Sequence, residues 1–272
     1  MINSDISVQA IEWRSVPLCR RYLWALFEAD PVSVSDGEVV RGHVARWALG
    51  VLANGKYEVL GVWLDPVSEA KRWREVFEDL ALRGVEKIRF VASNEPAEVR
   101  DSARATYPGT TVLPSIEQLL RQSLAQVAPR HRGSGTSELG ALLGAASAQD
   151  AQVTLASLAA GVWGTTYPSV VECWRAAVEQ LKPFYDSTPR VRRVILEGDD
   201  AVQRLHRSLC LAVSRHGPFA SRQAATEFIV GALDRAERSL VARGSVREAC
   251  TPHRAGSANR ASSRFRVEAL GL

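Results

Sequence analysis

Several acidic side chains in this 272-residue sequence are spaced so that they could bind a divalent cation. Glu28 and Asp30 are two residues apart in an extended segment, and residues two apart on a strand share one face. Glu197, Asp199 and Asp200 crowd a second segment. Because hard cations such as Mg²⁺ prefer anionic oxygen ligands, these carboxylates predict either a metal site or a group of solvated loop side chains.

A second grouping is the pair His206 and Cys210, which lie four residues apart on a predicted helix and therefore share a face. Imidazole and thiol groups at this spacing are typical of half a metal site, but no second pair with such spacing accompanies them. A core-facing thiol beside a surface imidazole is the alternative interpretation. Ser115 and His131 lack a group that would orient a base, and no glycine motif for nucleotide phosphates is present.

The elements that must position these side chains begin with three strands. Residues 21–34 form an extended segment, and residues 38–65 have the pattern of a hairpin. The pair Asn54-Gly55 lies between the two β-rich halves and is the strongest short signal for a tight turn.

A helix and further strands follow the hairpin. Apolar side chains at spacings of three and four, from Ala70 to Leu80, predict a helix that Ser68 caps and Gly84 ends. The later elements are a strand at 87–92, a helix near 96–105 and a short strand near 110–113. The resulting order, β-β-β-α-β-α-β, is that of a ribonuclease-H-like mixed sheet.

From about residue 115 the pattern becomes helical, interrupted by a predicted loop, "APRHRGSGTSE", and followed by helices at 200–215 and 221–241. The predicted fold class is therefore α/β, a ribonuclease-H-like mixed sheet with a helical insertion and C-terminal helices. The predicted parts are the first section of the core at 1–114, the insertion at 115–195, returning core helices at 196–242 and a basic disordered tail at 243–272.

The basic character of the chain is confined to that tail. Six arginines against two glutamates give the tail 6 − 2 = +4, which equals the formal net charge of the whole chain. With its many small and polar residues the tail is predicted to be disordered, and it could either screen DNA phosphates or serve as a solvated extension. The tail arginines are Arg243, Arg247, Arg254, Arg260, Arg264 and Arg266.

The remaining composition is that of an ordinary globular protein, with 46% hydrophobic and 24% charged residues. No apolar run approaches the roughly 18 residues of a membrane helix, and the first residues lack the pattern of a secretory signal. The four cysteines are scattered, which is typical of reduced thiols. We therefore expect a cytoplasmic protein without a membrane partner.

Several segments, in order, resemble the catalytic region of bacterial Mutator-family insertion-sequence transposases over about residues 14–241. "GVLANGKYEVLGVWLD" is similar to that family's second and third strands, and "EAKRWREVFEDLALRGVEKIRFV" to the helix and strand before its second catalytic aspartate. "WGTTYPSVVECWRAAVEQLKPFY" is similar to its tryptophan-bearing insertion. "DAVQRLHRSL" and "RHGPFASRQAATEFIVGAL" resemble the helix with the catalytic glutamate and the helix after it.

The resemblance implies a mechanism in which three carboxylates hold two Mg²⁺ ions for DNA strand transfer. The three positions fall on Glu28, Asn94 and Gln203, so two of the three carboxylates are replaced by amides. These positions supply a charge of about −1 instead of −3, which greatly weakens the attraction for two dications. The family's Cys-x-x-His signature falls on Ser115 and Gln118.

We therefore expect an inactive triad and no cofactor. Mg²⁺ would be required only if Asp30, Glu197, Asp199 and Asp200 rescue the site. The family's DNA-binding helical domain precedes its catalytic region, whereas only about 20 residues precede the first predicted strand here, so that domain is expected to be missing.

Three functions remain open at this point. The first is a catalytically inactive, transposase-derived protein that acts through binding DNA, a homologous transposase-like subunit or a second copy of itself. The second is an active, diverged enzyme of DNA transposition that uses the rescue carboxylates. The third is a decaying transposase fragment.

Overall fold

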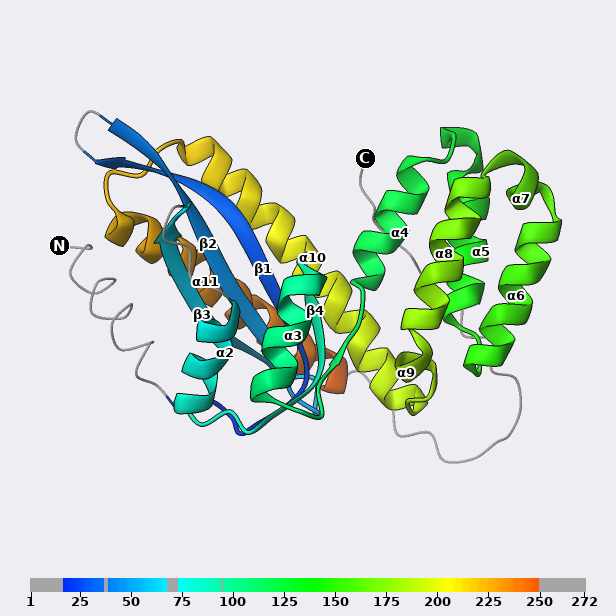
Figure 1. The fold of residues 1–272 in the computed structure, drawn as a ribbon, viewed down its shortest axis with the longest axis horizontal. Helices are drawn as coiled ribbons and strands as arrows, with labels where there is room; N and C mark the ends of the chain where they lie inside the picture. The colour runs from blue at the N-terminus through cyan, green and yellow to red at the C-terminus, as the bar shows by residue number, and fades with distance from the viewer. Residues whose placement is uncertain (1–16, 37–38, 68–72, 94, 250–272) are drawn as a thin grey trace. The chain divides into compact units, whose positions relative to one another are not determined.

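The computed structural model describes residues 17–36, 39–67, 73–93 and 95–249. The chain forms two compact units, one from residues up to 116 together with residues 189–244, and one from residues 117–188. The first unit is α/β and the second is helical (Figure 1). No helix among the described residues is both long enough and apolar enough to cross a membrane.

A five-stranded mixed sheet forms the centre of the first unit, with the strand order β3-β2-β1-β4-β5 (Figure 1). β2 pairs antiparallel with both β1 and β3, whereas β4 runs parallel to β1 and β5 runs parallel to β4. The α/β class and the order of elements predicted from the sequence are confirmed. The strands are β1 (Arg21–Asp36), β2 (Val39–Val51), β3 (Tyr57–Pro66), β4 (Lys87–Ser93) and β5 (Thr111–Val112).

The predicted hairpin is formed by β2 and β3. Its connection is a five-residue loop, 52–56, and not a two-residue turn. Within it the Leu52 amide donates to the Lys56 carbonyl at 2.8 Å, and the Asn54 side-chain oxygen accepts from the Lys56 amide at 3.0 Å. Gly55 has a φ of 83°, a left-handed conformation that only glycine adopts without strain.

Helices α2 (Trp73–Leu82) and α3 (Pro96–Thr106) cover one face of the sheet. The ring of Phe27 on β1 lies 4.6 Å from that of Phe77 on α2, whose ring lies 6.1 Å from that of Tyr107. The buried side chains of α2 recur at spacings of three and four, as predicted. The predicted cap Ser68 and the first predicted apolar residue, Ala70, lie outside the described residues.

Helices α10 (Pro189–His216) and α11 (Arg222–Ala249) complete the first unit. Both are longer than predicted, so the boundaries expected after residues 195 and 242 fall inside helices. A proline at the first position of α10 starts the helix without losing an internal hydrogen bond. Ser221 Oγ accepts from the Ala224 amide at 3.0 Å, which is the predicted cap of α11.

The second unit is a helical bundle around Trp174, which is fully buried and donates from Nε1 to Ser123 Oγ at 2.9 Å. Residues 132–138, predicted as loop, are helical. Within this helix Gly135 leaves room for the ring of Trp163, since a Cβ there would lie 2.6 Å from that ring. The bundle consists of α4 (Ile116–Ala125), η2 (Pro129–His131), α5 (Arg132–Leu143), α6 (Ala148–Ala160), α7 (Val162–Thr166), α8 (Pro168–Gln180) and α9 (Lys182–Tyr185).

Candidate functional site

A stripe of polar side chains on α10 faces the central strand β1. Asp199, Gln203, His206 and Cys210 are spaced by four, three and four residues, which places them on one side of a helix. Asp199 and Gln203 are buried, with 2% and 1% of their surface exposed, and the other two are half-buried. A polar stripe held against a sheet requires partners there, because unpaired polar groups are costly to bury.

Glu28 supplies the first of these partners. Its neighbour Phe27 points to the α2 face, so the alternation along β1 turns Glu28 toward α10. Gln203 Nε2 donates to Glu28 Oε1 at 3.2 Å. The other oxygen, Oε2, is buried without a hydrogen bond and lies 3.9 Å from His206 Nδ1.

Burial raises the pKa of Glu28 to about 7. The charge of His206 opposes this rise, the charge of Asp30 adds to it, and the hydrogen bond from Gln203 opposes it. The Glu28 carboxyl therefore keeps its proton to a higher pH than an ordinary carboxyl does, which makes it a weaker cation ligand.

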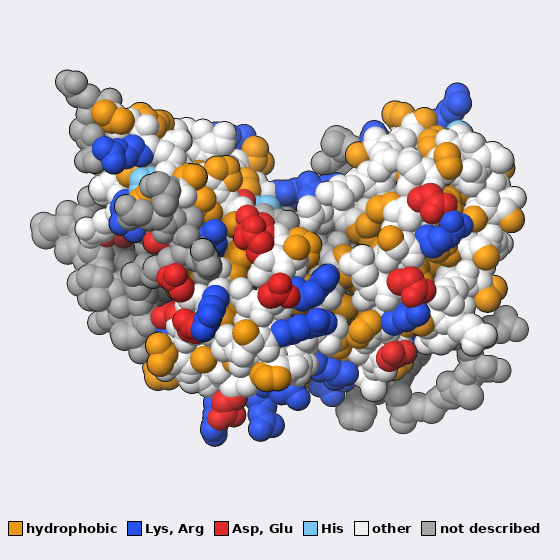
Figure 2. Space-filling view, viewed as in Figure 1, with side chains coloured by type: hydrophobic (Ala, Val, Ile, Leu, Met, Phe, Trp, Pro, Cys, Tyr) orange, Lys and Arg blue, Asp and Glu red, His pale blue; other side chains and the backbone are white. Residues whose placement is uncertain are grey.

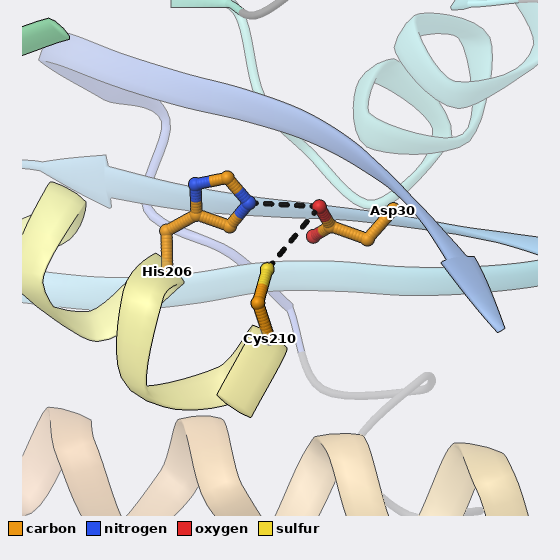
Figure 3. A group of neighbouring side chains, drawn as sticks. All are labelled: Asp30, His206 and Cys210. Carbon is orange, nitrogen blue, oxygen red and sulfur yellow. Dashed lines mark hydrogen bonds and ion pairs between the residues drawn. The ribbon is translucent and has the colours of Figure 1, made fainter. Parts of the chain in front are cut away.

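Asp30 is the second partner and contacts three side chains, of which Figure 3 shows His206 and Cys210. Its Oδ2 accepts from Trp47 Nε1 at 2.8 Å, and its Oδ1 lies 2.7 Å from His206 Nε2 and 3.5 Å from Cys210 Sγ. Burial lowers the pKa of His206, but hydrogen bonds with Asp30 and Cys210 and the charges of Asp30 and Glu28 outweigh it and raise that pKa to about 10. The imidazole is thus a cation at neutral pH, paired with Asp30.

Asp199 also has a partner outside α10. Ser115 Oγ donates to both carboxylate oxygens of Asp199, at 3.1 and 3.3 Å. Both residues are buried. Gln118, which the sequence resemblance paired with Ser115, lies on α4 in the second unit.

The structure brings some of the predicted site residues together and separates others. Glu28 and Gln203 are in contact, and Asp30 and Asp199 lie on the same faces of β1 and α10 as these two. Asn94 lies outside the described residues; the last described pair between the strands, Phe27 with Ser93, ends one residue before it.

One of the two interpretations of Glu197, Asp199 and Asp200, that they are solvated loop side chains, does not hold, because all three lie within α10. Glu197 is exposed, and Asp200 pairs with Arg204 one turn further along the helix. Neither is among the described contacts of Glu28. Only Asp199 of the three belongs to the buried stripe.

Sequence reasoning missed Trp47 as the donor to Asp30 and missed the grouping of Asp30 with His206 and Cys210. In the helix predicted at 200–215, the apolar residues Leu205 and Ala212 are only half-buried, so the apolar residues alone do not mark its buried side. The regular spacing of the polar residues 199, 203, 206 and 210 was the available signal.

The described donors do not fit a pair of Mg²⁺ ions. Burial raises the pKa of Glu28, Gln203 turns its amide NH₂ toward it, and Asp199 accepts from Ser115. Magnesium gives up its water reluctantly and requires anionic oxygens in octahedral geometry, which this arrangement does not offer.

The chain belongs to the Mutator family of transposases. The family model described as "Transposase, Mutator family" matches residues 1–239. The chain is 31% identical over 234 residues to the transposase for insertion sequence element ISRM3 of Rhizobium meliloti (strain 1021), covering 86% of this chain and 58% of that protein.

Two further relatives have similar names. The chain is 32% identical to a probable transposase for an ISRM3-like element of Sinorhizobium fredii (strain NBRC 101917 / NGR234), covering 86% of this chain and 58% of that protein. It is 27% identical to a probable insertion-sequence transposase of Corynebacterium diphtheriae, covering 82% and 65%. The chain thus spans less than two thirds of the length of these relatives.

Replacing Glu28 by glutamine should flatten the pH dependence of stability between pH 4.5 and 7. The folded pKa of about 7 lies above the ordinary 4.5, so the folded state binds more protons in this window. In the unaltered protein the free energy of unfolding should therefore fall as the pH rises through it, by on the order of 3 kcal/mol from this group. Urea denaturation at several pH values would measure the change.

The matched control is Glu98→Gln, because Glu98 is an exposed carboxylate in the first turn of α3. This variant should keep the slope of the unaltered protein. A Glu28→Gln variant with that same slope would contradict the raised pKa.

Proposed function

We propose that this chain is a transposase-derived protein with a ribonuclease-H-like core that does not perform strand transfer and acts by binding. Its partners would be DNA and a transposase-like subunit or a second copy of itself. The strand order β3-β2-β1-β4-β5, with β2 antiparallel in an otherwise parallel centre, supports the ribonuclease-H-like assignment. The names of the relatives support a context of DNA transposition.

The observation that carries this proposal is the hydrogen bond between Gln203 and Glu28. At these two family positions a pair of carboxylates would repel each other, and a cation between them would relieve the repulsion. Here an amide donates to the single carboxylate at 3.2 Å, so the pair is held together without a cation. An amide oxygen turned toward a metal would have to give up this bond.

An active enzyme would need carboxylates from elsewhere on the same faces. Asp30 and Asp199 are the described candidates, but Asp30 is engaged by Trp47 and His206, and Asp199 by Ser115. Recruiting either would leave buried donors unpaired, which costs about 1–3 kcal/mol for each group. Their engagement favours the inactive form.

A role in binding DNA would depend on the charge of the protein surface and not on the residues at the triad positions. On the face shown in Figure 2, acidic and basic side chains lie close to one another. Among the described ion pairs are Arg175–Glu172 and Arg74–Glu78. The formal charge of the chain apart from residues 243–272 is 4 − 4 = 0. Residues 243–272 hold six arginines against two glutamates, and this net charge of +4 would attract phosphates.

The unaltered full chain should show no Mg²⁺- or Mn²⁺-dependent cleavage or joining of DNA. The test compares it with the triple variant Glu28→Asp, Asn94→Asp, Gln203→Glu, followed by gel analysis of labelled DNA and by calorimetric titration with Mn²⁺. The variant should bind Mn²⁺ at least about tenfold more tightly, because it restores three anionic ligands.

Metal-dependent cleavage by the unaltered protein would overturn the proposal. Loss of that cleavage in Asp30→Asn or Asp199→Asn, with Asp200→Asn as the control on the exposed side of α10, would identify rescue carboxylates. A folded triple variant that gains no metal affinity would show that the positions inferred for the triad are wrong.

Removing residues 250–272 should weaken binding to nonspecific DNA and reduce its dependence on salt. This segment contains Arg254, Arg260, Arg264 and Arg266, and each phosphate contact contributes about 0.9 to the slope of log K against log salt. The slope should fall by up to about four units in fluorescence anisotropy titrations.

A full-length variant with the same four arginines changed to glutamine separates charge from chain length and should bind as the shortened protein does. The backbone of α11 reaches Ala249, so the cut leaves that helix whole, with Arg243 and Arg247 on it. Unchanged affinity and slope after the cut would assign DNA binding to the folded units.

A further inference from the structure

Three side chains of different chemistry converge beside Glu28, at none of the family's three positions (Figure 3). The Oδ1 atom of Asp30, Nε2 of His206 and Sγ of Cys210 all lie within 4.8 Å of one another. Asp30 comes from β1 and the other two from successive turns of α10, so the fold joins parts of the chain about 176 residues apart in sequence. All three are half-buried and therefore accessible to a small ion.

This donor set suits a borderline transition metal and not magnesium. Imidazole and thiolate are ligands of Zn²⁺ and Co²⁺, and a carboxylate oxygen completes a mixed set. In a tetrahedral zinc site the sulfur and oxygen ligands lie about 3.6 Å apart and the nitrogen and oxygen ligands about 3.4 Å apart. Cys210 Sγ and Asp30 Oδ1 already lie at 3.5 Å, and His206 Nε2 must move from 2.7 Å to admit the ion.

The surroundings of these ligands are those of a metal site. A metal-binding histidine usually donates its other ring N–H to a carboxylate. Glu28 Oε2 is fully buried, has no hydrogen bond and lies 3.9 Å from His206 Nδ1, so it is placed to accept that proton. Trp47 Nε1 holds Asp30 Oδ2, which leaves Oδ1 directed toward His206 and Cys210.

We propose that Asp30, His206 and Cys210 bind one Zn²⁺ ion, with water as the fourth ligand, and that the ion fastens α10 to the central strand. The ion replaces the proton between His206 Nε2 and Asp30 Oδ1 and the proton of the Cys210 thiol, so binding releases protons. His206 Nδ1–H then donates to Glu28. The proposal concerns a structural ion and is independent of whether the protein cleaves DNA.

The test uses the full chain, freed of metal with a chelator and titrated with Co²⁺, which reports thiolate coordination through a sulfur-to-cobalt charge-transfer band. One equivalent should bind with this band, and Zn²⁺ should displace it. Cys210→Ser should abolish the band, and Asp30→Asn and Glu28→Gln should each weaken binding about 10- to 100-fold. Zn²⁺ should also raise the melting temperature of the unaltered protein but not of Cys210→Ser.

The control is Cys173→Ser, which removes a half-buried thiol in the second unit and should leave the titration unchanged. Circular dichroism confirms that each variant is folded; if Cys210→Ser is unfolded, Asp30→Asn takes its place. A folded, unaltered protein without the band, or a band that Cys173→Ser removes and Cys210→Ser keeps, would overturn the proposal.

Discussion

The constraint on which the first unit depends is the placement of two carboxylates of one strand under one helix. Glu28 is buried and Asp30 is half-buried, and both point from β1 toward α10, where polar groups without partners are costly. On α10, Gln203 hydrogen-bonds to Glu28 and His206 pairs with Asp30. A shift of α10 by one residue would turn these partners away and leave the carboxylates unpaired.

The same arrangement joins β1 and α10 through side-chain contacts of this chain alone. Carboxylates that face one another repel, whereas an amide or an imidazolium opposite a carboxylate attracts it. In this chain an amide–carboxylate hydrogen bond and an imidazolium–carboxylate pair lie between β1 and α10. These contacts stabilise the packing of α10 on the sheet, and they fit the proposed role in binding.

The sequence predicted the sheet well because its signals are local. Asn54 and Gly55 marked the hairpin, and the apolar spacing of α2 marked the face that packs against Phe27. The limits of α10 were missed because its first turns carry arginines and acids without a continuous apolar stripe. The helix at 132–143 was missed because glycine and serine favour loops locally, whereas packing against Trp163 requires the glycine.

The site was predictable only in part, for a similar reason. Resemblance identified Glu28 and Gln203, and local spacing identified His206 and Cys210, but no local pattern links either pair to Asp30 or Trp47. Those links depend on the register of β1 against β2 and on how α10 lies over the sheet. The register between distant elements is set by the packing of the whole core, so one sequence does not reveal that Asp30 contacts Trp47 and His206.

The central claim, that polar pairing fastens α10 to β1, is tested most directly by a double-mutant cycle on Asp30 and His206. The free energy of unfolding would be measured at pH 7 with chelator for the unaltered chain, Asp30→Asn, His206→Gln and the double variant. A coupling energy above about 1.5 kcal/mol is predicted, because each single change leaves the other, half-buried side chain without its ionic partner. Additivity of the two changes within about 0.5 kcal/mol would contradict the claim.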